Sequence, residues 1–407
     1  MNQNSIQVYP YRWVVLFLYI LITAAICMQW LTFAPIARDA KEFYSVNPIQ
    51  IDLLSLVFLA VFVVVAIPAS YVIDTYGIRK GVGFGAVLMG VFGILKGIYA
   101  NDYTIVLICQ VGLAIAQPFL LNAVTKISVL WFPIQERATS VALGTLAQFL
   151  GIIFVMILTP LLLEGGEKGA KIPEVMLLYG VISLVSAILF LIFSREKPPT
   201  SPSTHGEDSR LPFWEGIRFL WKKNDMRKIL FLFLIGLGVF NAVSTCIDQI
   251  AEVKGLNIEE SGLVGGIMLI AGILGGVAVP PLSDKIQRRK IFLSVAMGGF
   301  LFGLALFTIS NSFLPLLLAS AIIGFFLLGI GAPIGFQYCA EITSPAPEST
   351  SQGLLLLVGQ ISGIVFILGM NYFGMISFLY LFLGLSVLNF ILVFFLKESP
   401  FMEIKKD

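Results

Sequence analysis

The sequence predicts an all-α membrane protein whose twelve transmembrane helices form two pseudo-symmetric six-helix lobes. Three observations lead to this fold class. The 407 residues are 58% hydrophobic and only 12% charged, whereas soluble domains are about 45–50% apolar and about 25% charged. Apolar segments of roughly 20 residues, the length that crosses a bilayer, recur along the whole chain. Segments of the first half also recur in the second, which indicates a duplication.

The apolar segments give the positions of the helices. They predict helices over 13–37, 51–73, 81–99, 104–130, 138–163, 175–194, 228–252, 260–281, 291–309, 314–340, 350–371 and 375–396. A stretch rich in Pro, Ser and charge follows the sixth segment, and 211–221 has the pattern of a short amphipathic surface helix. We therefore expect an N-terminal six-helix lobe at 1–194, a cytoplasmic linker at 195–227 and a C-terminal six-helix lobe at 228–407.

Basic residues predict how the helices are oriented. An even number of spans places both termini on one side of the membrane, and nineteen lysines and arginines fall on that side against five on the other. Short cytoplasmic loops are enriched in basic residues. We therefore expect cytoplasmic termini in a multi-pass protein of the cell (inner) membrane. Lys96 and Lys126 fall near helix ends, where long side chains can reach the membrane surface.

Two repeated elements mark the cytoplasmic side of both halves. The segment Asp74 to Lys80 recurs as Asp284 to Lys290 at a spacing of 210, and the segments that begin at Glu136 and Glu348 are alike at a spacing of 212. An acid beside paired bases can hold helix ends together in one conformation and release them in another. Positive-inside charge alone explains the bases, and a helix dipole favours an acid at Glu136 and Glu348. The predicted cytoplasmic gate residues are Asp74, Gly77, Arg79, Lys80, Glu136, Arg137, Asp284, Arg288, Arg289, Glu341 and Glu348.

Few polar side chains fall near the middle of the predicted helices. A carboxamide in hydrocarbon is costly without a partner, so these groups either line a cavity between the lobes or form interhelical hydrogen bonds. The predicted substrate-binding residues are Trp30, Gln117, Gln148, Asn241 and Gln360. Second-rank candidates for the same cavity are Gln29, Asn122, Phe240, Thr245, Asp248, Gln337 and Tyr338.

Titratable groups are scarce in the predicted helices. No Asp or Glu occupies the middle of a helix, and the single histidine, His205, lies in the linker. Proton-driven carriers need an intramembrane group that titrates, so we expect facilitated diffusion. Asp248, toward the outer end of the seventh helix, is the alternative coupling site or an outer attractant for cations. The four cysteines lie in apolar segments without ligand-like spacing, so we expect no metal and no cofactor.

Several local sequences resemble one known family. They are Tyr11-Arg12-Trp13, the segment from Gln29 to Pro35, Gln117-Pro118-Phe119 with Lys126, the segment from Trp131 to Thr139, and the segment from Ala340 to Gln360. They resemble the feline leukaemia virus subgroup C receptor family, and the Asp74 to Lys80 segment is similar to the loop signature of the major facilitator superfamily. The resemblance implies the major facilitator fold in a prokaryotic member. It also implies a choline or ethanolamine carrier, with links to haem export, that acts as a facilitator.

The resemblance further implies an aromatic cage, because ring faces attract a quaternary ammonium. Trp30 matches the cage tryptophan of helix 1, and Gln117 and Gln360 match site glutamines. The cage tyrosine of helix 7 falls at Asn241, which removes about 0.5–2 kcal/mol of cation–π attraction and supplies an amide instead. Phe240 or Tyr338 would replace the ring if the helix is rotated.

We therefore expect a secondary transporter that moves a small polar or cationic organic solute by alternating access, as a uniporter, with choline-like or other amines favoured. The alternative solute is a vitamin-like heterocycle or a haem-type metabolite, with proton coupling through Asp248 as a variant. A non-transporting membrane receptor is a remote alternative. The predicted spans hold no nucleophile–base or metal constellation, so we expect no enzyme. The expected partners are the solute and the lipid bilayer, without nucleic acid, and we expect a monomer.

Overall fold

The computed structural model describes residues 8–163, 171–200, 215, 222–286, 288–343 and 348–399, with backbone alone for 74, 125, 129, 134–139, 142, 284, 340 and 348–350. Every regular element in this part of the chain is a helix. Twelve helical segments among the described residues are long and apolar enough to cross a membrane. The predicted fold class, an all-α protein with twelve transmembrane helices, is therefore confirmed.

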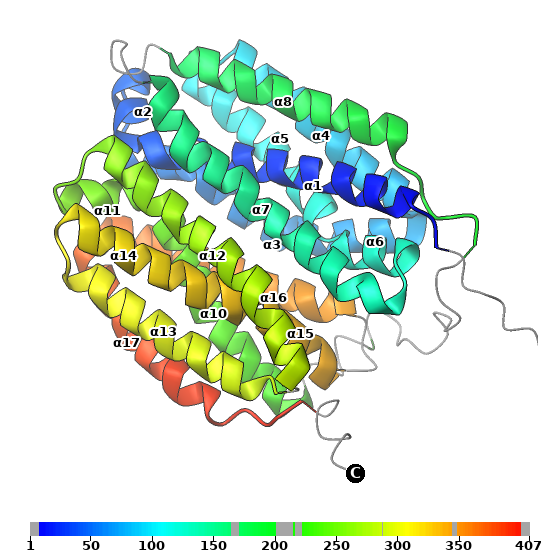
Figure 1. Cartoon of the computed structure of the whole chain (residues 1–407). Helices are drawn as coiled ribbons and strands as arrows, with labels where there is room; N and C mark the ends of the chain where they lie inside the picture. The colour runs from blue at the N-terminus through cyan, green and yellow to red at the C-terminus, as the bar shows by residue number, and fades with distance from the viewer. Residues whose placement is uncertain are drawn as a thin grey trace, which may run out of the picture.

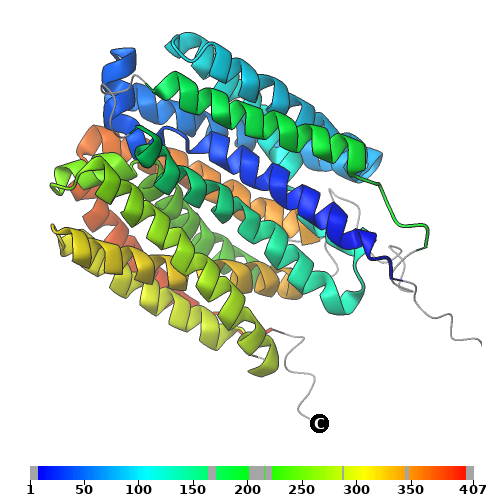
Figure 2. The same ribbon diagram turned by 45° about the horizontal axis from the view of Figure 1, so that its top comes forward.

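The helices pack as two groups that follow each other in the sequence (Figures 1 and 2). The first group contains α1 (Tyr11–Trp30), η1 (Ala34–Ile36), α2 (Ala37–Tyr44), α3 (Pro48–Tyr76), α4 (Ile78–Ile98), α5 (Tyr103–Leu121), α6 (Val124–Trp131), α7 (Ile134–Leu163) and α8 (Ile172–Phe193). The second contains α10 (Asn224–Thr245), α11 (Ile247–Val253), α12 (Ile258–Ile286), α13 (Lys290–Ile309), α14 (Phe313–Ile323), η3 (Gly324–Gly331), α15 (Ala332–Thr343), α16 (Glu348–Phe373) and α17 (Met375–Val393). We call these groups the N-terminal and C-terminal lobes.

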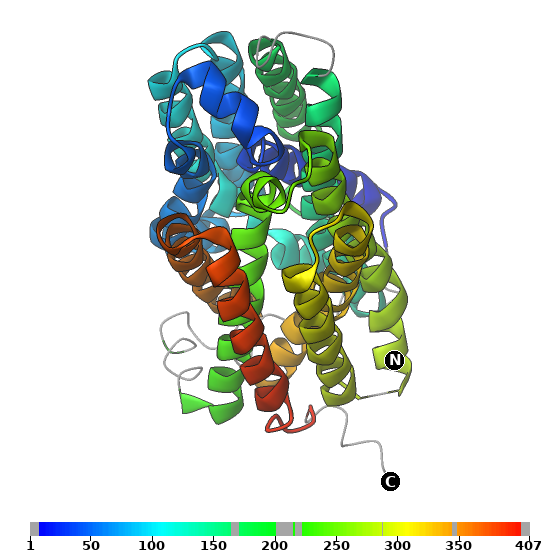
Figure 3. The same ribbon diagram turned by 90° about the vertical axis from the view of Figure 1, so that its left-hand side faces the viewer.

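Both lobes present the same two faces. The terminal face is the end of the bundle at which α1 begins and α17 ends, and the opposite face is the end that carries α2 and α11. Figure 3 looks onto the opposite face, where α2 and α11 come together between the lobes. Local sequence fixes helix starts at this face: Asn47 and Gln50 form a reciprocal capping box at the start of α3, and Asp102 caps α5.

Four predicted helices are interrupted, and they are the first and fourth of each lobe. The predicted helix 13–37 stops at Trp30 and resumes as η1 and α2. Pro35, at the start of η1, explains this break because proline has no N–H to donate to a preceding helical turn. The predicted helix 228–252 breaks at Cys246, where the chain holds no proline.

The fourth helix of each lobe is interrupted differently. The predicted helix 104–130 divides into α5 and α6 a turn beyond Pro118, and the predicted helix 314–340 contains the π-helix η3. Such irregular turns are tolerated at membrane depth where they are enclosed by protein, and π-turns frequently occur at functional sites.

The repeated glycines Gly151 and Gly363 lie where helices approach closely. A Cβ atom at Gly151 would lie 1.9 Å from the carbonyl oxygen of Ala24 in α1. A Cβ atom at Gly363 would lie 2.7 Å from a methyl carbon of Leu59 in α3, which belongs to the other lobe. The repeat therefore marks tight helix contacts, and Gly363 brings the two lobes together beside the predicted site.

Candidate functional site

Trp30 is fixed at the end of α1 by α3. Its side chain is 5% exposed, and its ring Nε1–H donates to the backbone oxygen of Ser55 at 3.2 Å. The Ser55 hydroxyl in turn donates to the backbone oxygen of Trp30 at 3.2 Å. Because α1 ends here, this carbonyl has no helical partner of its own. The break after Trp30 and the pairing with Ser55 together set the orientation of the indole.

Asn241 and Gln360 are brought together by α10 and α16. The Asn241 amide nitrogen donates to the backbone oxygen of Gly359 at 3.1 Å and to Oε1 of Gln360 at 3.3 Å. Asn241 is 4% exposed. Two of the five predicted substrate-binding residues thus form one hydrogen-bonded pair at the edge of the C-terminal lobe.

Gln117 and Gln148 come from the N-terminal lobe. Gln117 lies on α5 and is 3% exposed, while Gln148 lies on α7 and is half-buried. Neither carboxamide hydrogen-bonds another residue within the described part of the chain. Their role in binding stays a prediction, but both retain a full set of donors and acceptors for a solute.

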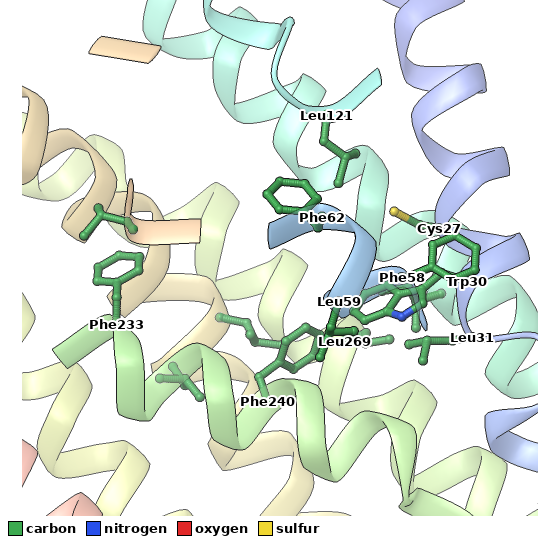
Figure 4. Close-up of a cluster of buried hydrophobic side chains, with 14 of the residues drawn as sticks. Cys27, Trp30, Leu31, Phe58, Leu59, Phe62, Leu121, Phe233, Phe240 and Leu269 are labelled. Carbon is green, nitrogen blue, oxygen red and sulfur yellow. The ribbon is translucent and has the colours of Figure 1, made fainter. Parts of the chain in front are cut away.

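Phe240 is the aromatic ring that α10 supplies next to Asn241. It belongs to the same buried apolar cluster as Trp30 and Leu59, and Figure 4 shows these side chains together with Leu269. The ring centroid of Phe240 lies 6.2 Å from that of Phe149 on α7. Tyr338 instead donates its hydroxyl to the backbone oxygen of Lys397, at the terminal face. Of the two rings considered as a replacement for the cage tyrosine, Phe240 lies beside the site.

Other second-rank candidates make contacts inside one lobe. Gln29 donates to the Ser183 hydroxyl at 2.9 Å, Asn122 donates to Ser70 at 3.0 Å, and Gln337 donates to Glu341 at 3.0 Å. Thr245 is buried at the end of α10. These contacts suit the alternative of interhelical hydrogen bonding, and cavity lining by these residues stays a prediction.

A buried polar cluster lies behind Trp30 in the N-terminal lobe. Lys96 is fully buried, so it does not reach the membrane surface as the sequence suggested. Its Nζ lies 3.5 Å from Oγ1 of Thr32 and 3.5 Å from Oε1 of Gln110, and 5.6 Å from the ring centroid of Phe33. Thr32 and Phe33 form the break after α1, so this cluster supports the bend that presents Trp30.

An ion pair joins the lobes at the opposite face. Arg38 of α2 pairs with Asp248 of α11. The guanidinium Nη2 and Nε of Arg38 lie 2.5 and 2.9 Å, respectively, from Oδ1 of Asp248. The backbone N–H of Arg38 donates to the other carboxylate oxygen at 3.0 Å. The Asp248 side chain is fully buried and that of Arg38 is 20% exposed. Asp248, predicted as a cavity residue, is thus held in a contact between the two short helices that follow the breaks in α1 and α10.

A second inter-lobe cluster is centred on Asp52 of α3, which sequence reasoning missed. Asp52 is 2% exposed and accepts from the Gln249 side chain at 2.7 Å and from the Asn371 side chain at 2.6 Å. The Cys246 thiol sulfur lies 3.6 Å from the same carboxylate. The sequence placed Asp52 at the start of a helix, and its three partners lie about 200 or more residues away along the chain. The only hint in the sequence was that Asp52 is an acid just inside an apolar stretch, where a charge is costly without a partner.

The terminal face contains the repeated loop signature. Gly77 has φ +93°, and a Cβ atom there would lie 2.3 Å from a carboxylate oxygen of Glu196. Glu196 accepts from the backbone N–H groups of Ile78 and Arg79 at 2.8 and 2.7 Å, which caps α4. Gly77 is therefore required both by its backbone conformation and by the acid that packs on it.

The second copy of the signature is built in the same way. Glu398 accepts from the backbone N–H groups of Arg289 and Lys290 at 2.7 and 3.2 Å. Arg289 also forms an ion pair with Glu341, with 2.9 Å between Nη2 and Oε1. Glu196 and Glu398 were missed, although Arg195-Glu196-Lys197-Pro198 and Lys397-Glu398-Ser399-Pro400 recur at a spacing of 202.

The other predicted gate residues are only partly described. Arg79, Lys80 and Arg288 are exposed at the terminal face. The side chains of Asp74, Glu136, Arg137, Asp284 and Glu348 lie outside the described residues. The proposed gate at this face therefore stays a prediction.

Comparisons with known proteins agree with this architecture. The chain is 29% identical over 375 residues to solute carrier family 49 member A3 of Danio rerio, which covers 89% of this chain and 78% of the relative. It is 28% identical over 377 residues to the choline/ethanolamine transporter FLVCR1 of Felis catus, and the match covers 88% of this chain and 67% of that relative. It is 27% identical over 386 residues to the choline/ethanolamine transporter flvcr2a of Danio rerio, and the match covers 89% of this chain and 80% of that relative.

A solved structure has the same fold. The crystal structure of a bacterial homologue of the human lysosomal transporter Spinster superimposes with a TM-score of 0.67 at 15% identity, over 98% of this chain and 97% of that one. The sequence model described as Major Facilitator Superfamily matches residues 15–367. Together with the twelve spans in two lobes, this match means that the chain belongs to the Major Facilitator Superfamily of membrane transporters.

Proposed function

We propose that this transporter carries a small cationic amine, of the choline or ethanolamine type, between the two lobes. The observation that carries the proposal is Trp30, a buried indole at a helix break, with the carboxamides of Gln117 and Gln360 on the two lobes. An indole face attracts a cation, and amides without full internal pairing offer hydrogen bonds to a polar tail. Relatives that are named choline/ethanolamine transporters support the same solute class.

Alternating access follows from the contacts at the opposite face. The Arg38–Asp248 ion pair and the Asp52 cluster join the lobes there, so a solute passes that face only when both clusters separate. The short helices α2 and α11 follow directly on the breaks next to Trp30 and Thr245. Movement at these breaks would link solute binding to the separation of the lobes.

We propose facilitated transport without proton coupling through Asp248. Burial raises the pKa of the Asp248 carboxyl, and the three hydrogen bonds that it accepts from Arg38 oppose this rise by favouring the charged form. The pair therefore acts as a gate contact that breaks and reforms, while a coupling site would exchange protons in each cycle.

The orientation and assembly are also part of the proposal. The excess of basic residues at the terminal face supports cytoplasmic termini, which makes the opposite face the outer face of the cell (inner) membrane. The order of the helices along the chain, with one group ending at Phe193 and the next beginning at Asn224, supports the proposed lobes 1–194 and 228–407. We propose that one monomer contains the complete pathway.

A ligand screen by thermal shift tests the solute class. We expect choline or ethanolamine to raise the melting temperature of the purified protein, and Trp30→Ala to abolish the shift because it removes the cation–π contact. Trp13→Ala is the matched control, since Trp13 lies on the same helix, is 42% exposed and packs on Phe132 away from the site. A choline shift that survives in Trp30→Ala would contradict the proposed role of Trp30. A shift with heterocycles or porphyrins alone would favour the alternative solutes.

A further inference from the structure

We propose that Asn241 makes this transporter select ammonium groups that carry N–H bonds over quaternary ammonium groups. This inference rests on the proposed function, since it specifies which amine the same site prefers. Ethanolamine carries such N–H bonds, and choline is its N-trimethylated counterpart. The inference depends on the orientation of one carboxamide, and that orientation follows from its neighbours.

The Asn241 carboxamide has only one orientation that satisfies its surroundings. The backbone oxygen of Gly359 can only accept a hydrogen bond, and it lies 3.1 Å from the Asn241 amide nitrogen. The group that faces α16 must therefore be the NH2 group. The second N–H of this group is directed to Oε1 of Gln360 at 3.3 Å. Both donors of Asn241 are thus used inside the C-terminal lobe.

This orientation leaves the carbonyl oxygen of Asn241 as the free part of the side chain. A carboxamide is planar, so Oδ1 lies on the side away from the nitrogen and hence away from Gly359. Within the described part of the chain, Oδ1 accepts no hydrogen bond. An amide oxygen left without a hydrogen bond offers a solute an acceptor and no donor.

Asn241 lies at the boundary between the lobes. A Cβ atom at Gly363 would lie 2.9 Å from Cβ of Asn241 and 2.7 Å from Leu59, so α16 brings Asn241 close to α3 of the other lobe. Leu59 belongs to the buried cluster that also contains Trp30 and Phe240 (Figure 4). Asn241 therefore lies at the lobe boundary beside this cluster, and its amide oxygen is the atom left to accept a hydrogen bond from a solute there.

The chemistry of the two amine classes then separates them. Ring faces attract both a primary and a quaternary ammonium, so Trp30 and Phe240 do not discriminate strongly. A primary ammonium also donates a charge-assisted hydrogen bond to the amide oxygen, which is about twice as strong as a neutral one. A trimethylammonium group has no N–H to donate and covers the oxygen with methyl groups, which leaves a polar group desolvated and unpaired.

A methylation series tests this selection directly. We would measure the affinities of the purified full-length protein for ethanolamine, N-methylethanolamine, N,N-dimethylethanolamine and choline. We expect the largest loss at the last methyl group, which removes the last N–H, with choline about tenfold or more weaker than ethanolamine. Asn241→Leu, which keeps the volume and removes the acceptor, should reduce this ratio to within about threefold.

Two further variants keep the test decisive. Asn241→Tyr places a ring at the position and should favour choline over ethanolamine. Asn389→Leu is the matched control, because Asn389 is another fully buried asparagine of the same lobe that donates to a backbone oxygen, that of Leu232 at 3.1 Å. It should leave the ratio between the two amines unchanged even if it lowers stability.

The outcomes separate this inference from the proposed function. If choline binds as tightly as ethanolamine and Asn241→Leu does not alter their ratio, the selection by Asn241 is wrong while an amine carrier stands. If none of the four amines binds, the proposed function and this inference fail together. If Asn241→Leu unfolds, the wild-type series and Asn241→Tyr still decide, because equal affinity along the series contradicts the inference by itself.

Discussion

Replacing Asp248 by asparagine should loosen the opposite face of the transporter. The Asp248 carboxylate is fully buried and accepts three hydrogen bonds from Arg38, whose side chain is 20% exposed. Removing one partner of a buried ion pair costs about 3–5 kcal/mol, because the other charge stays buried without compensation. Arg38 retains some water contact, and the asparagine oxygen still accepts one bond, so we expect about 2 kcal/mol against the closed arrangement. That free energy corresponds to a roughly 30-fold larger population of the open arrangement.

Cys246 provides the assay for this change. Its thiol is fully buried beside Asp52 in the inter-lobe cluster, so a maleimide reaches it only when the lobes separate at the opposite face. The other cysteines, Cys27, Cys109 and Cys339, are also buried and would be replaced by alanine. We expect Asp248→Asn to raise the labelling rate of Cys246 by about 30-fold at constant pH.

A control on the same face makes the result interpretable. Asp102→Asn changes an aspartate that caps α5 within the N-terminal lobe, where it accepts from Thr104 and Ile105, and it should leave the labelling rate within about twofold. The melting temperature of each variant would be measured in parallel. An Asp248→Asn rate equal to that of the control would refute the gate role of the ion pair.

Two further predictions concern other parts of the frame. Gly77→Ala should lower the free energy of unfolding by about 1–3 kcal/mol, because the residue has φ +93° and its Cβ would meet Glu196. Thermal denaturation measures this loss. The control Gly353→Ala, at a position where an added Cβ meets no atom within 4 Å, should lower the free energy of unfolding far less. Asp52→Asn should raise Cys246 labelling by about tenfold, since it weakens the acceptor that Gln249 and Asn371 share; a rate unchanged from wild type would mean that the Asp52 cluster does not keep the lobes closed.

The sequence determined the helices better than their interruptions. Long apolar runs predicted all twelve spans, because backbone groups in a bilayer must be satisfied within a helix. Pro35 and Pro118 lie beside two of the breaks, but the apolar pattern predicted continuous helices there. The break at Cys246 has no proline, and α11 beyond it packs against η1 and α2 of the other lobe, contacts that no local pattern indicates.

Candidate site residues were predictable only where the residue's own polarity and position in a helix indicate its role. Asn241 and Gln360 were both selected as polar groups at mid-helix, and they meet in the structure. The partner of Asp248 is Arg38, 210 residues away, and nothing local in the sequence pairs them. Asp52 is hidden for the same reason, since its role depends on residues of the other lobe.

The repeats also showed only part of the terminal face. The spacings of 210 and 212 were recognised from three identical residues in each pair of segments, whereas the repeat at 202 is shorter and shares two, an acid (Glu196 and Glu398) and a proline (Pro198 and Pro400). Their function is visible only once both carboxylates are seen to bind the backbone N–H groups after the loop signature.

The most direct measurement is exchange of radiolabelled ethanolamine in proteoliposomes that contain the purified protein. We expect saturable counterflow that persists when the proton gradient is collapsed and is lost in Trp30→Ala but not in Trp13→Ala. Counterflow that is absent with both ethanolamine and choline, or that is unaffected by Trp30→Ala, would contradict the claim that this protein carries small amines past Trp30.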